Sequence, residues 1–267
     1  MARVYHGHDL VAGTPCVLKF ALDPQDKVAC LFLRREARIT AQINHDHVVR
    51  LYHYGELPFL GPYLVTEYVA GPSLATLLDR GPLPMTPAIL IGAQIASALH
   101  AVHRQGFEHR DVKPTNILLD EGGALAPHAR LIDFGISGSG GEGDTRSAGS
   151  RYGTPEYVAP ERITGEETGA LADQYSLGCV LYEILTGRTP YAGESPQSVL
   201  QQHLLGTPRP LRTFPAAQEI PLALEYVVLR AMAREPRERF ESMAALRAAL
   251  AACLGGAARR GHPADRR

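Results

Sequence analysis

The sequence predicts an α+β fold in which a small antiparallel β-sheet lobe with one helix precedes a larger, mainly α-helical lobe. Two observations support this prediction. Segments of alternating apolar residues are confined to the part before residue 70, whereas apolar residues at three-and-four spacing dominate the remainder. A turn-like Ala-Gly-Pro-Ser sequence at residues 70–73 separates the two patterns.

The small lobe is expected to begin with a β-hairpin over residues 2–19, where two partly β-branched stretches flank the turn-like sequence HDLVAGTP. Residues 26–43 carry apolar side chains at helical spacing and predict an amphipathic helix that includes Glu36. Two further strands are predicted at residues 48–55 and 62–69.

In the larger lobe, long apolar-periodic segments predict four helices, at residues 85–105, 174–187, 222–234 and 242–253. Short strands are expected at residues 117–119 and 130–132. Residues 135–153 are rich in Gly, Ser and Thr and predict a long irregular loop. We expect residues 255–267 to form a flexible basic tail.

The composition is that of an ordinary globular protein. Its 27 basic and 28 acidic residues give no global electrostatic preference for nucleic acid. No apolar run approaches the ~20 residues needed to cross a bilayer, and the first residues do not resemble a secretion signal. The four cysteines form no CxxC pair, which indicates reduced thiols. We therefore expect a cytoplasmic location, no membrane segment and no nucleic-acid partner.

Residues 109–116, with the sequence HRDVKPTN, combine a carboxylate, an ammonium group and a carboxamide on one short loop. Phosphoryl transfer requires a carboxylate for the hydroxyl proton, a cation for the phosphoryl group and oxygen ligands for a metal ion. Asp111, Lys113 and Asn116 supply one of each. Further along the chain, Asp133 precedes Phe134 and Gly135 at the end of an expected strand and offers a second metal ligand.

These motifs occur in the order of the protein kinase family, which the sequence resembles over nearly its whole length, and most of all the bacterial serine/threonine kinases of eukaryotic type. The matching segments are VLKF at 17–20, RREA with Glu36, TEYV at 66–69, HRDVKPTN at 109–116, DFG at 133–135, GTPEYVAPE at 153–161 and DQYSLG at 173–178. The resemblance implies a two-lobed protein-kinase-like fold over residues 1–254, with a small lobe at 1–69 and a large lobe at 70–254.

The resemblance also implies a role for each matching residue. Lys19, paired with Glu36, would hold the α- and β-phosphates of ATP. Asp111 would position the substrate hydroxyl, and Lys113 would contact the γ-phosphate. The remaining implied contacts are the backbone of Glu67 and Val69 at adenine, the side chains of Val4, Val17 and Leu118 on its faces, and Asn116 and Asp133 as ligands of Mg²⁺ or Mn²⁺.

Thr154 in the GTPEY segment, together with Lys113, resembles the serine/threonine pattern of the family, and we include Thr154 among the expected catalytic residues. The implied partners are protein substrates and, for autophosphorylation, a second copy of the chain. Arg110 precedes the catalytic aspartate, which in this family accompanies control by a phosphate on the following loop. The candidate phosphorylation sites are Thr145, Ser147 and Ser150.

Other matches imply structural roles. Glu161 and Arg239 correspond to a buried ion pair of the helical lobe, and Asp173 corresponds to the aspartate that anchors the catalytic loop. His109 is expected to pack in the core and not to act as a base.

The family's glycine-rich loop, GxGxxGxV, is matched only in part. Aligning Val4 with its valine puts Ala2 at the third glycine, so the first two glycines and the first strand would precede Met1. Either the true start lies upstream or the chain lacks this strand. The loss would weaken phosphate binding and expose a sheet edge. A catalytically impaired pseudokinase or scaffold is therefore the alternative function, and a small-molecule kinase of related fold is a third.

Overall fold

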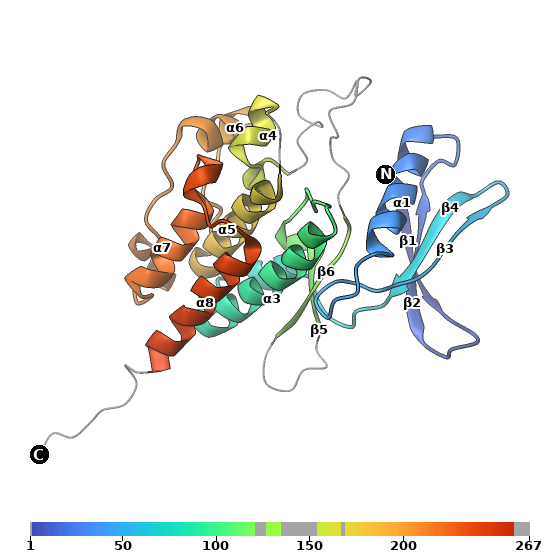
Figure 1. The fold of residues 1–267 in the computed structure, drawn as a ribbon, viewed down its shortest axis with the longest axis horizontal. Coiled ribbons are helices and arrows are strands. Elements are labelled where there is room, and N and C mark those ends of the chain that lie inside the picture. Colours follow the sequence, from blue (N-terminus) through green and yellow to red (C-terminus); the bar gives the residue numbers. More distant parts are fainter. Residues whose placement is uncertain (1, 121–126, 135–153, 167–168, 259–267) are drawn as a thin grey trace, which may run out of the picture.

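The computed structural model describes residues 2–120, 127–134, 154–166 and 169–258. The small sheet lobe and the larger helical lobe lie side by side, which confirms the predicted fold class (Figure 1). The elements of the small lobe are β1 (Ala2–His8), β2 (Pro15–Ala21), α1 (Lys27–Thr40), β3 (Leu51–Leu57) and β4 (Gly61–Glu67).

The small sheet is antiparallel, with strand order β1-β2-β4-β3. In β2, Lys19 lies opposite Val4 of β1 and Leu64 of β4. Because side chains alternate along a strand, Val17 shares the face of Lys19, and this face looks toward α1. The register therefore places Lys19 on the inner face of the sheet.

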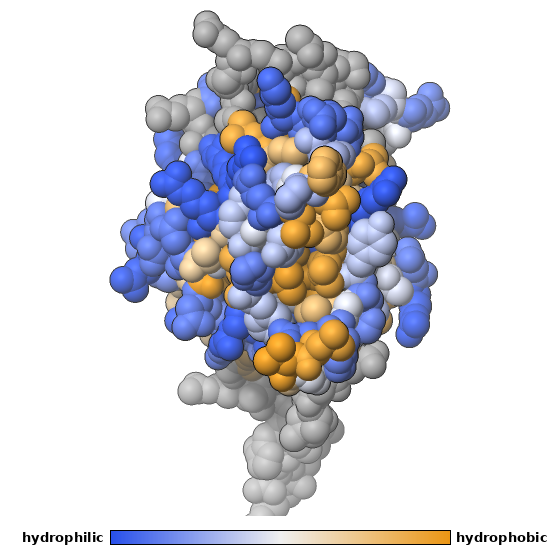
Figure 2. Space-filling view, turned by 90° about the vertical axis from the view of Figure 1, so that its right-hand side faces the viewer, coloured by the Kyte–Doolittle hydropathy of each residue, from blue (hydrophilic) through white to orange (hydrophobic). Residues whose placement is uncertain are grey.

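The outer face of the sheet is apolar and aromatic, and Figure 2 shows apolar side chains gathered across the middle of this side of the molecule. The rings of Tyr5 and Phe20 meet edge to face with centroids 6.2 Å apart, and Phe20 stacks on Tyr63 at 5.8 Å. Leu18 and Val65 lie opposite each other in the same layer. These cross-strand pairs stabilise the register of the sheet.

Helix α1 begins with a side-chain cap at Asp26, the first residue of the predicted helical segment. The carboxylate of Asp26 accepts hydrogen bonds from the N–H groups of Val28 and Ala29, each at 3.0 Å, which pairs two donors left free at a helix start. Leu33 and Ala37 pack against Leu64 of β4. This packing turns the Glu36 side of α1 toward Lys19.

The strand predicted over residues 48–55 starts later, at Leu51. Val48 instead forms a parallel bridge with Leu131 of the large lobe, and the Val49 N–H donates to the Leu131 carbonyl at 3.0 Å. The prediction of this boundary was wrong because a β-branched run indicates extended backbone without indicating which strand it pairs with.

The large lobe contains a two-stranded sheet and a set of helices. Its elements are α2 (Leu74–Leu78), α3 (Met85–Arg104), β5 (Ile117–Asp120), β6 (His128–Leu131), α4 (Pro160–Thr164), α5 (Ala170–Thr186), α6 (Pro196–Leu205), α7 (Leu222–Ala231) and α8 (Met243–Ala258). The four predicted helices correspond to α3, α5, α7 and α8, whereas α2, α4 and α6 were not predicted. Helix α8 continues to Ala258, so the predicted start of the flexible tail at residue 255 was wrong. Helix α6 starts with a capping box between Ser195 and Ser198.

Helix α3 runs through the core beside α5 and α8 (Figure 1). By length and composition alone, its 20 residues meet the requirement for a membrane span, but half of its most apolar window is buried inside the fold. Ile89, Ile95 and Leu99 have no exposed surface. These features are typical of a core helix. The four cysteines are also buried, and each is a free thiol, as expected.

Candidate functional site

The site lies between the lobes, where the ammonium group of Lys19 contacts two carboxylates. Its Nζ donates to both oxygens of Glu36 at 2.9 Å and to Oδ1 of Asp133 at 2.8 Å. The side chains of Lys19 and Glu36 are only 18% and 12% exposed, whereas that of Asp133 is 48% exposed. The cluster therefore joins β2 and α1 of the small lobe to Asp133, the second residue after β6.

The charges in this cluster depend on one another. Burial on its own would lower the pKa of Lys19, but the adjacent carboxylates of Glu36 and Asp133 outweigh it and raise this pKa. Burial raises the pKa of Glu36 to about 7, although the Lys19 ammonium opposes the shift. Lys19 thus stays charged, and the charge of Glu36 depends on Lys19.

Asp133 has a left-handed backbone conformation, with φ of 54°, which is uncommon for a residue with a side chain. The next residue, Phe134, is buried and packs on the ring of His109 with centroids 5.0 Å apart. This buried anchor holds the strained residue in place, so that its carboxylate reaches Lys19.

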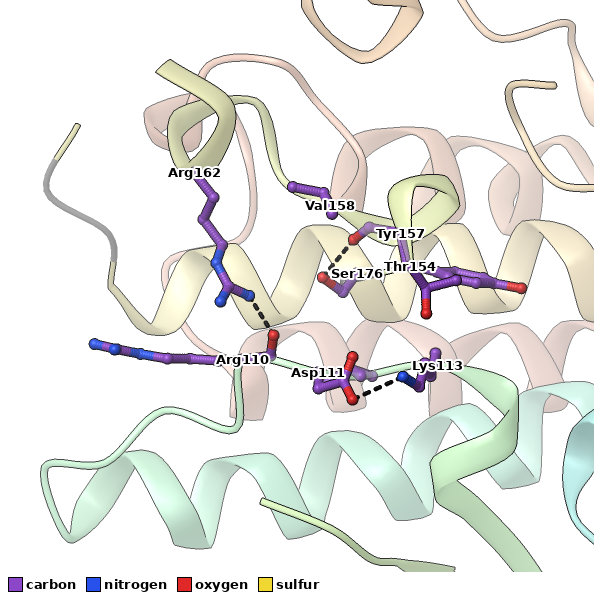
Figure 3. Close-up of a pocket in the computed structure, with 9 residues that line it drawn as sticks. Arg110, Asp111, Lys113, Thr154, Tyr157, Val158, Arg162 and Ser176 are labelled. Carbon is purple, nitrogen blue, oxygen red and sulfur yellow. Dashed lines mark hydrogen bonds and ion pairs between the residues drawn. The ribbon is translucent and has the colours of Figure 1, made fainter. Parts of the chain in front are cut away.

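The loop at residues 109–116 brings the three predicted groups together, and Figure 3 shows two of them, Asp111 and Lys113. Lys113 Nζ lies 2.8 Å from Oδ2 of Asp111. The Asn116 amide donates to that same oxygen and to the Asp111 backbone carbonyl, each at 2.9 Å. The Ile132 N–H donates to the Asn116 carbonyl at 3.0 Å, which places Asn116 next to the segment that carries Asp133.

Asp173 of α5 holds the start of this loop. Its two oxygens accept the backbone N–H groups of His109 and Arg110, each at 2.8 Å, and Oδ2 also lies 2.8 Å from Nε2 of His103. Burial would raise the pKa of Asp173, but these hydrogen bonds and the nearby histidines outweigh burial and lower it to about 2. The anchor fixes Arg110 at φ 68°, a left-handed conformation that isolated chains disfavour.

Residues 154–157, which include the turn η2 (Pro155–Tyr157), form the opposite wall. Figure 3 shows the Thr154 side chain pointing from this wall toward Lys113. Ser176 of α5 donates to the Tyr157 carbonyl at 2.7 Å, and the Tyr157 hydroxyl donates to Glu183 at 2.6 Å. These bonds fix the far end of the 154–157 segment to α5.

A pocket of about 380 Å³ opens between this wall and α2. Its lining includes Ala75 and Leu78 of α2, Lys113 and Pro114 of the loop, and Thr154. An extended peptide placed in this pocket would pass beside Asp111, because Lys113 and Thr154 also line the adjoining hollow that contains Asp111.

The predicted adenine contacts come from both lobes. Val4 and Val17 share the face of Lys19, and Val4 is 60% exposed. Leu118 lies on β5, where it forms a bridge with Ser73 of the segment that follows β4. Glu67 ends β4, and its side chain turns toward Arg130.

Arg110 donates to Glu108 at 3.0 Å. Burial of Arg35 on α1 lowers the pKa of Arg35, and the positive charge of Arg110 adds to the shift. Arg35 of the small lobe and Arg110 of the 109–116 loop are therefore near enough for their charges to interact. The candidate phosphorylation sites Thr145, Ser147 and Ser150 lie outside the described residues.

Glu161 and Arg239 form a buried, two-pronged ion pair with distances of 2.7 and 2.8 Å. The Arg239 side chain also donates to the carbonyls of Ala233, Arg234 and Leu171. This arrangement satisfies the guanidinium and carboxylate in the core, as a buried charge pair requires.

The sequence analysis missed several residues of this site. Arg162 donates to the Arg110 carbonyl, His103 contacts Asp173, and Glu183 binds Tyr157. Arg162 directly follows the APE segment, but none of the three residues forms a local pattern with the residue that it contacts.

Comparison with known proteins agrees with this geometry. The protein kinase domain family matches residues 1–250. A probable serine/threonine-protein kinase of Streptomyces coelicolor is 38% identical over 271 residues, which cover 96% of this chain and 38% of that protein. The serine/threonine-protein kinase PknB of Mycobacterium leprae is 39% identical over 82% of this chain and 35% of its own length.

The serine/threonine-protein kinase PknD of Mycobacterium tuberculosis is 38% identical over 91% of this chain and 36% of its own length. The chain thus spans little more than a third of the length of these relatives. The solved structure of Rad53 residues 1–466 in complex with AMP-PNP superposes with a TM-score of 0.74, over 92% of this chain and 60% of that chain. At 24% identity, this likeness concerns the fold.

Proposed function

The chain belongs to the protein kinase family, and from this premise we propose that it transfers the γ-phosphoryl group of ATP to serine or threonine hydroxyls of proteins. The observation that carries the proposal is the convergence of Lys19, Asp111, Asn116 and Asp133 on one site between the lobes. Phosphoryl transfer depends on positioning and electrostatic stabilisation, and these groups supply both.

In this mechanism Asp111 accepts a hydrogen bond from the substrate hydroxyl and takes up its proton. The Asn116 amide and Lys113 hold the Asp111 carboxylate from two directions, which orients it for an incoming hydroxyl. Lys113 also lies where it would neutralise charge on the transferred phosphoryl group.

Lys19 would bind the α- and β-phosphates of ATP. Its contact with Glu36 orients the ammonium group, and its contact with Asp133 would give way to the nucleotide. The apolar side chains of Val4, Val17 and Leu118 suit the faces of adenine, and the backbone of Glu67 and Val69 suits its edge.

A divalent metal ion, Mg²⁺ or Mn²⁺, fits the residues present. Asp133 and Asn116 offer carboxylate and carboxamide oxygens, the ligand type that such ions prefer. No group of three or more His, Cys, Asp and Glu side chains able to hold a metal occurs among the described residues. The remaining ligands would therefore come from the nucleotide phosphates and water. Bound there, the metal would neutralise phosphate charge.

The preference for serine or threonine is supported by Thr154, which faces Lys113 across the groove. A protein substrate is supported by the open pocket between α2 and the 154–157 segment. We also propose regulation by phosphorylation at Thr145, Ser147 or Ser150, since Arg110 and Arg35 offer paired cations beside the catalytic loop.

The test is intact-mass analysis and phosphosite mapping of the purified chain with Mg-ATP, beside Asp111→Asn. Phosphate incorporated by the wild type and absent from the variant would support the proposal. Equal incorporation in both would overturn the assignment of Asp111. Incorporation in neither, while nucleotide still binds, would favour the scaffold alternative.

A further inference from the structure

His203 lies on α6 with only 1% of its surface exposed. Its Nδ1 is 2.7 Å from the hydroxyl of Tyr175 on α5, and the ring of Tyr191 meets it edge-on with centroids 4.8 Å apart. Helix α6 also packs against η2 of the 154–157 segment. The imidazole is thus enclosed between α5, α6 and the wall of the substrate groove.

The position of the imidazole proton follows from its surroundings. Burial lowers the pKa of His203 to about 4, so near neutral pH one ring nitrogen carries a proton and the other accepts. Burial also raises the pKa of Tyr175, which keeps its hydroxyl protonated. That hydroxyl has no hydrogen-bond acceptor other than Nδ1 in the part of the chain that the structure describes. The imidazole proton therefore resides on Nε2.

Nε2 is buried, and no acceptor among the described residues lies at the distance and angle of a well-formed hydrogen bond with it. An unpaired buried donor is costly and uncommon in folded proteins. The backbone carbonyls of Pro155 and Glu156 lie beside the ring, close enough to favour its protonated form. A small adjustment of this turn would bring a carbonyl onto the Nε2 proton.

The turn is anchored unevenly. Tyr157 is tied to α5 through both its carbonyl and its hydroxyl. The Pro155 carbonyl, by contrast, accepts a long bond of 3.5 Å from the Val158 N–H, and Oε2 of Glu156 is buried without a partner among the described residues. The part of the 154–157 segment nearest Thr154 is therefore the part whose polar groups are incompletely paired.

On the basis of the function proposed above, we propose that His203 is a positioning residue for substrate binding: its Nε2–H binds the carbonyl of Pro155 or Glu156 when a protein substrate fills the groove. This bond holds Thr154 facing Lys113 and Asp111. Hydrogen bonds around a reaction site are often long without substrate and shorten in the complex, which accounts for the unpaired donor.

Two substitutions separate the two ring nitrogens. In His203→Gln the amide nitrogen can take the place of Nε2, whereas in His203→Asn the shorter amide reaches only the place of Nδ1, beside Tyr175. Ser195→Ala is the matched control, because it removes the side-chain cap of α6 without touching the imidazole or the groove.

The assay is steady-state phosphorylation of dephosphorylated casein, with ATP hydrolysis in the absence of casein and Tm measured in parallel. We expect His203→Asn to raise the KM for casein about tenfold, the effect of one lost hydrogen bond, with an unchanged KM for ATP and unchanged hydrolysis. His203→Gln should keep the KM for casein near the wild-type value, even if its Tm falls. Ser195→Ala should lower Tm alone.

A casein KM in His203→Asn equal to that of the wild type would overturn the inference. The inference would also be overturned if the KM for casein rose in proportion to the decrease in Tm across all three variants. His203 would then serve only as a core residue. If the wild type transfers no phosphate to casein or to itself, the proposed function fails, and the inference fails with it. These results are distinguishable, since the first two require an active wild type.

Discussion

The ammonium group of Lys19 lies 2.8 Å from Oδ1 of Asp133, and this ion pair joins β2 of the small lobe to the end of β6 in the large lobe. Glu36 holds the same ammonium group from the opposite side. The two lobes are thus linked at the place where the proposed function requires the phosphates of ATP.

Lys19→Met should lower the affinity for ATP at least about tenfold, since a charge-assisted contact to phosphate is lost. Glu36 would lose its cation and, with a pKa already raised by burial, would take up a proton near neutral pH. Titration of a fluorescent ATP analogue into wild type and variant measures the loss. Equal affinity in the two proteins would contradict the phosphate-binding role.

Asp111→Asn should reduce kcat by about two to four decades, because a carboxamide cannot accept the hydroxyl proton. ATP affinity should stay near the wild-type value, since the Asp111 carboxylate contacts Lys113 and Asn116 and not Lys19. Steady-state phosphorylation and nucleotide titration test both statements. A variant with wild-type kcat would remove Asp111 from the mechanism.

Asp133→Asn should weaken ATP binding in the presence of Mg²⁺ more than in its absence, because a carboxylate ligand is replaced by a neutral one. Calorimetric titrations with Mg²⁺ and with EDTA give the two affinities. If the substitution lowers the ATP affinity by the same factor with Mg²⁺ and with EDTA, Asp133 acts on ATP without a metal ion.

Glu161→Gln should lower the free energy of unfolding by about 3–5 kcal/mol, since the buried guanidinium of Arg239 would lose its counterion. The matched control is Glu56→Gln, which breaks the exposed ion pair with Arg34 and should leave stability nearly unchanged. Urea unfolding measures both variants. Similar losses of unfolding free energy in the two variants would show that burial does not determine how much an ion pair contributes to stability.

Acid should destabilise the protein in part through Asp173. Its pKa of about 2 in the folded state lies below the ordinary value of 3.8, so the unfolded chain binds a proton more readily. This stability is complete above about pH 5 and is lost as the pH falls toward 2, with a size of about 2 kcal/mol. Urea unfolding between pH 7 and pH 2 measures the loss, to which other carboxylates also contribute.

The share of Asp173 in this acid dependence can be isolated with His103→Gln, which keeps a hydrogen-bond donor but removes the imidazole charge that lowers the pKa of Asp173. The pKa of Asp173 should then return toward its ordinary value, and the acid-dependent loss should be smaller. An unchanged slope in this variant would exclude His103 as a main cause of the lowered pKa.

Helices and strands were predicted correctly where the spacing of residues within a short segment indicates them. The apolar spacing of α1 and α3 and the alternation in β1 and β2 are properties of short segments, and the structure confirms these elements. Helix α6 escaped prediction because its only strong signal is the capping box at Ser195. The start of β3 was misplaced because Val48 and Val49 are extended but pair with the other lobe.

By itself, the sequence determined the chemical groups of the candidate site and their order, because residue type and short spacing are visible along the chain. The loop with Asp111, Lys113 and Asn116 is an example. Only the tertiary structure decided that Lys19 reaches Asp133 and that His203 faces Tyr175 and the 154–157 segment. Such contacts arise from the packing of remote elements, and the pattern of any single segment does not encode them.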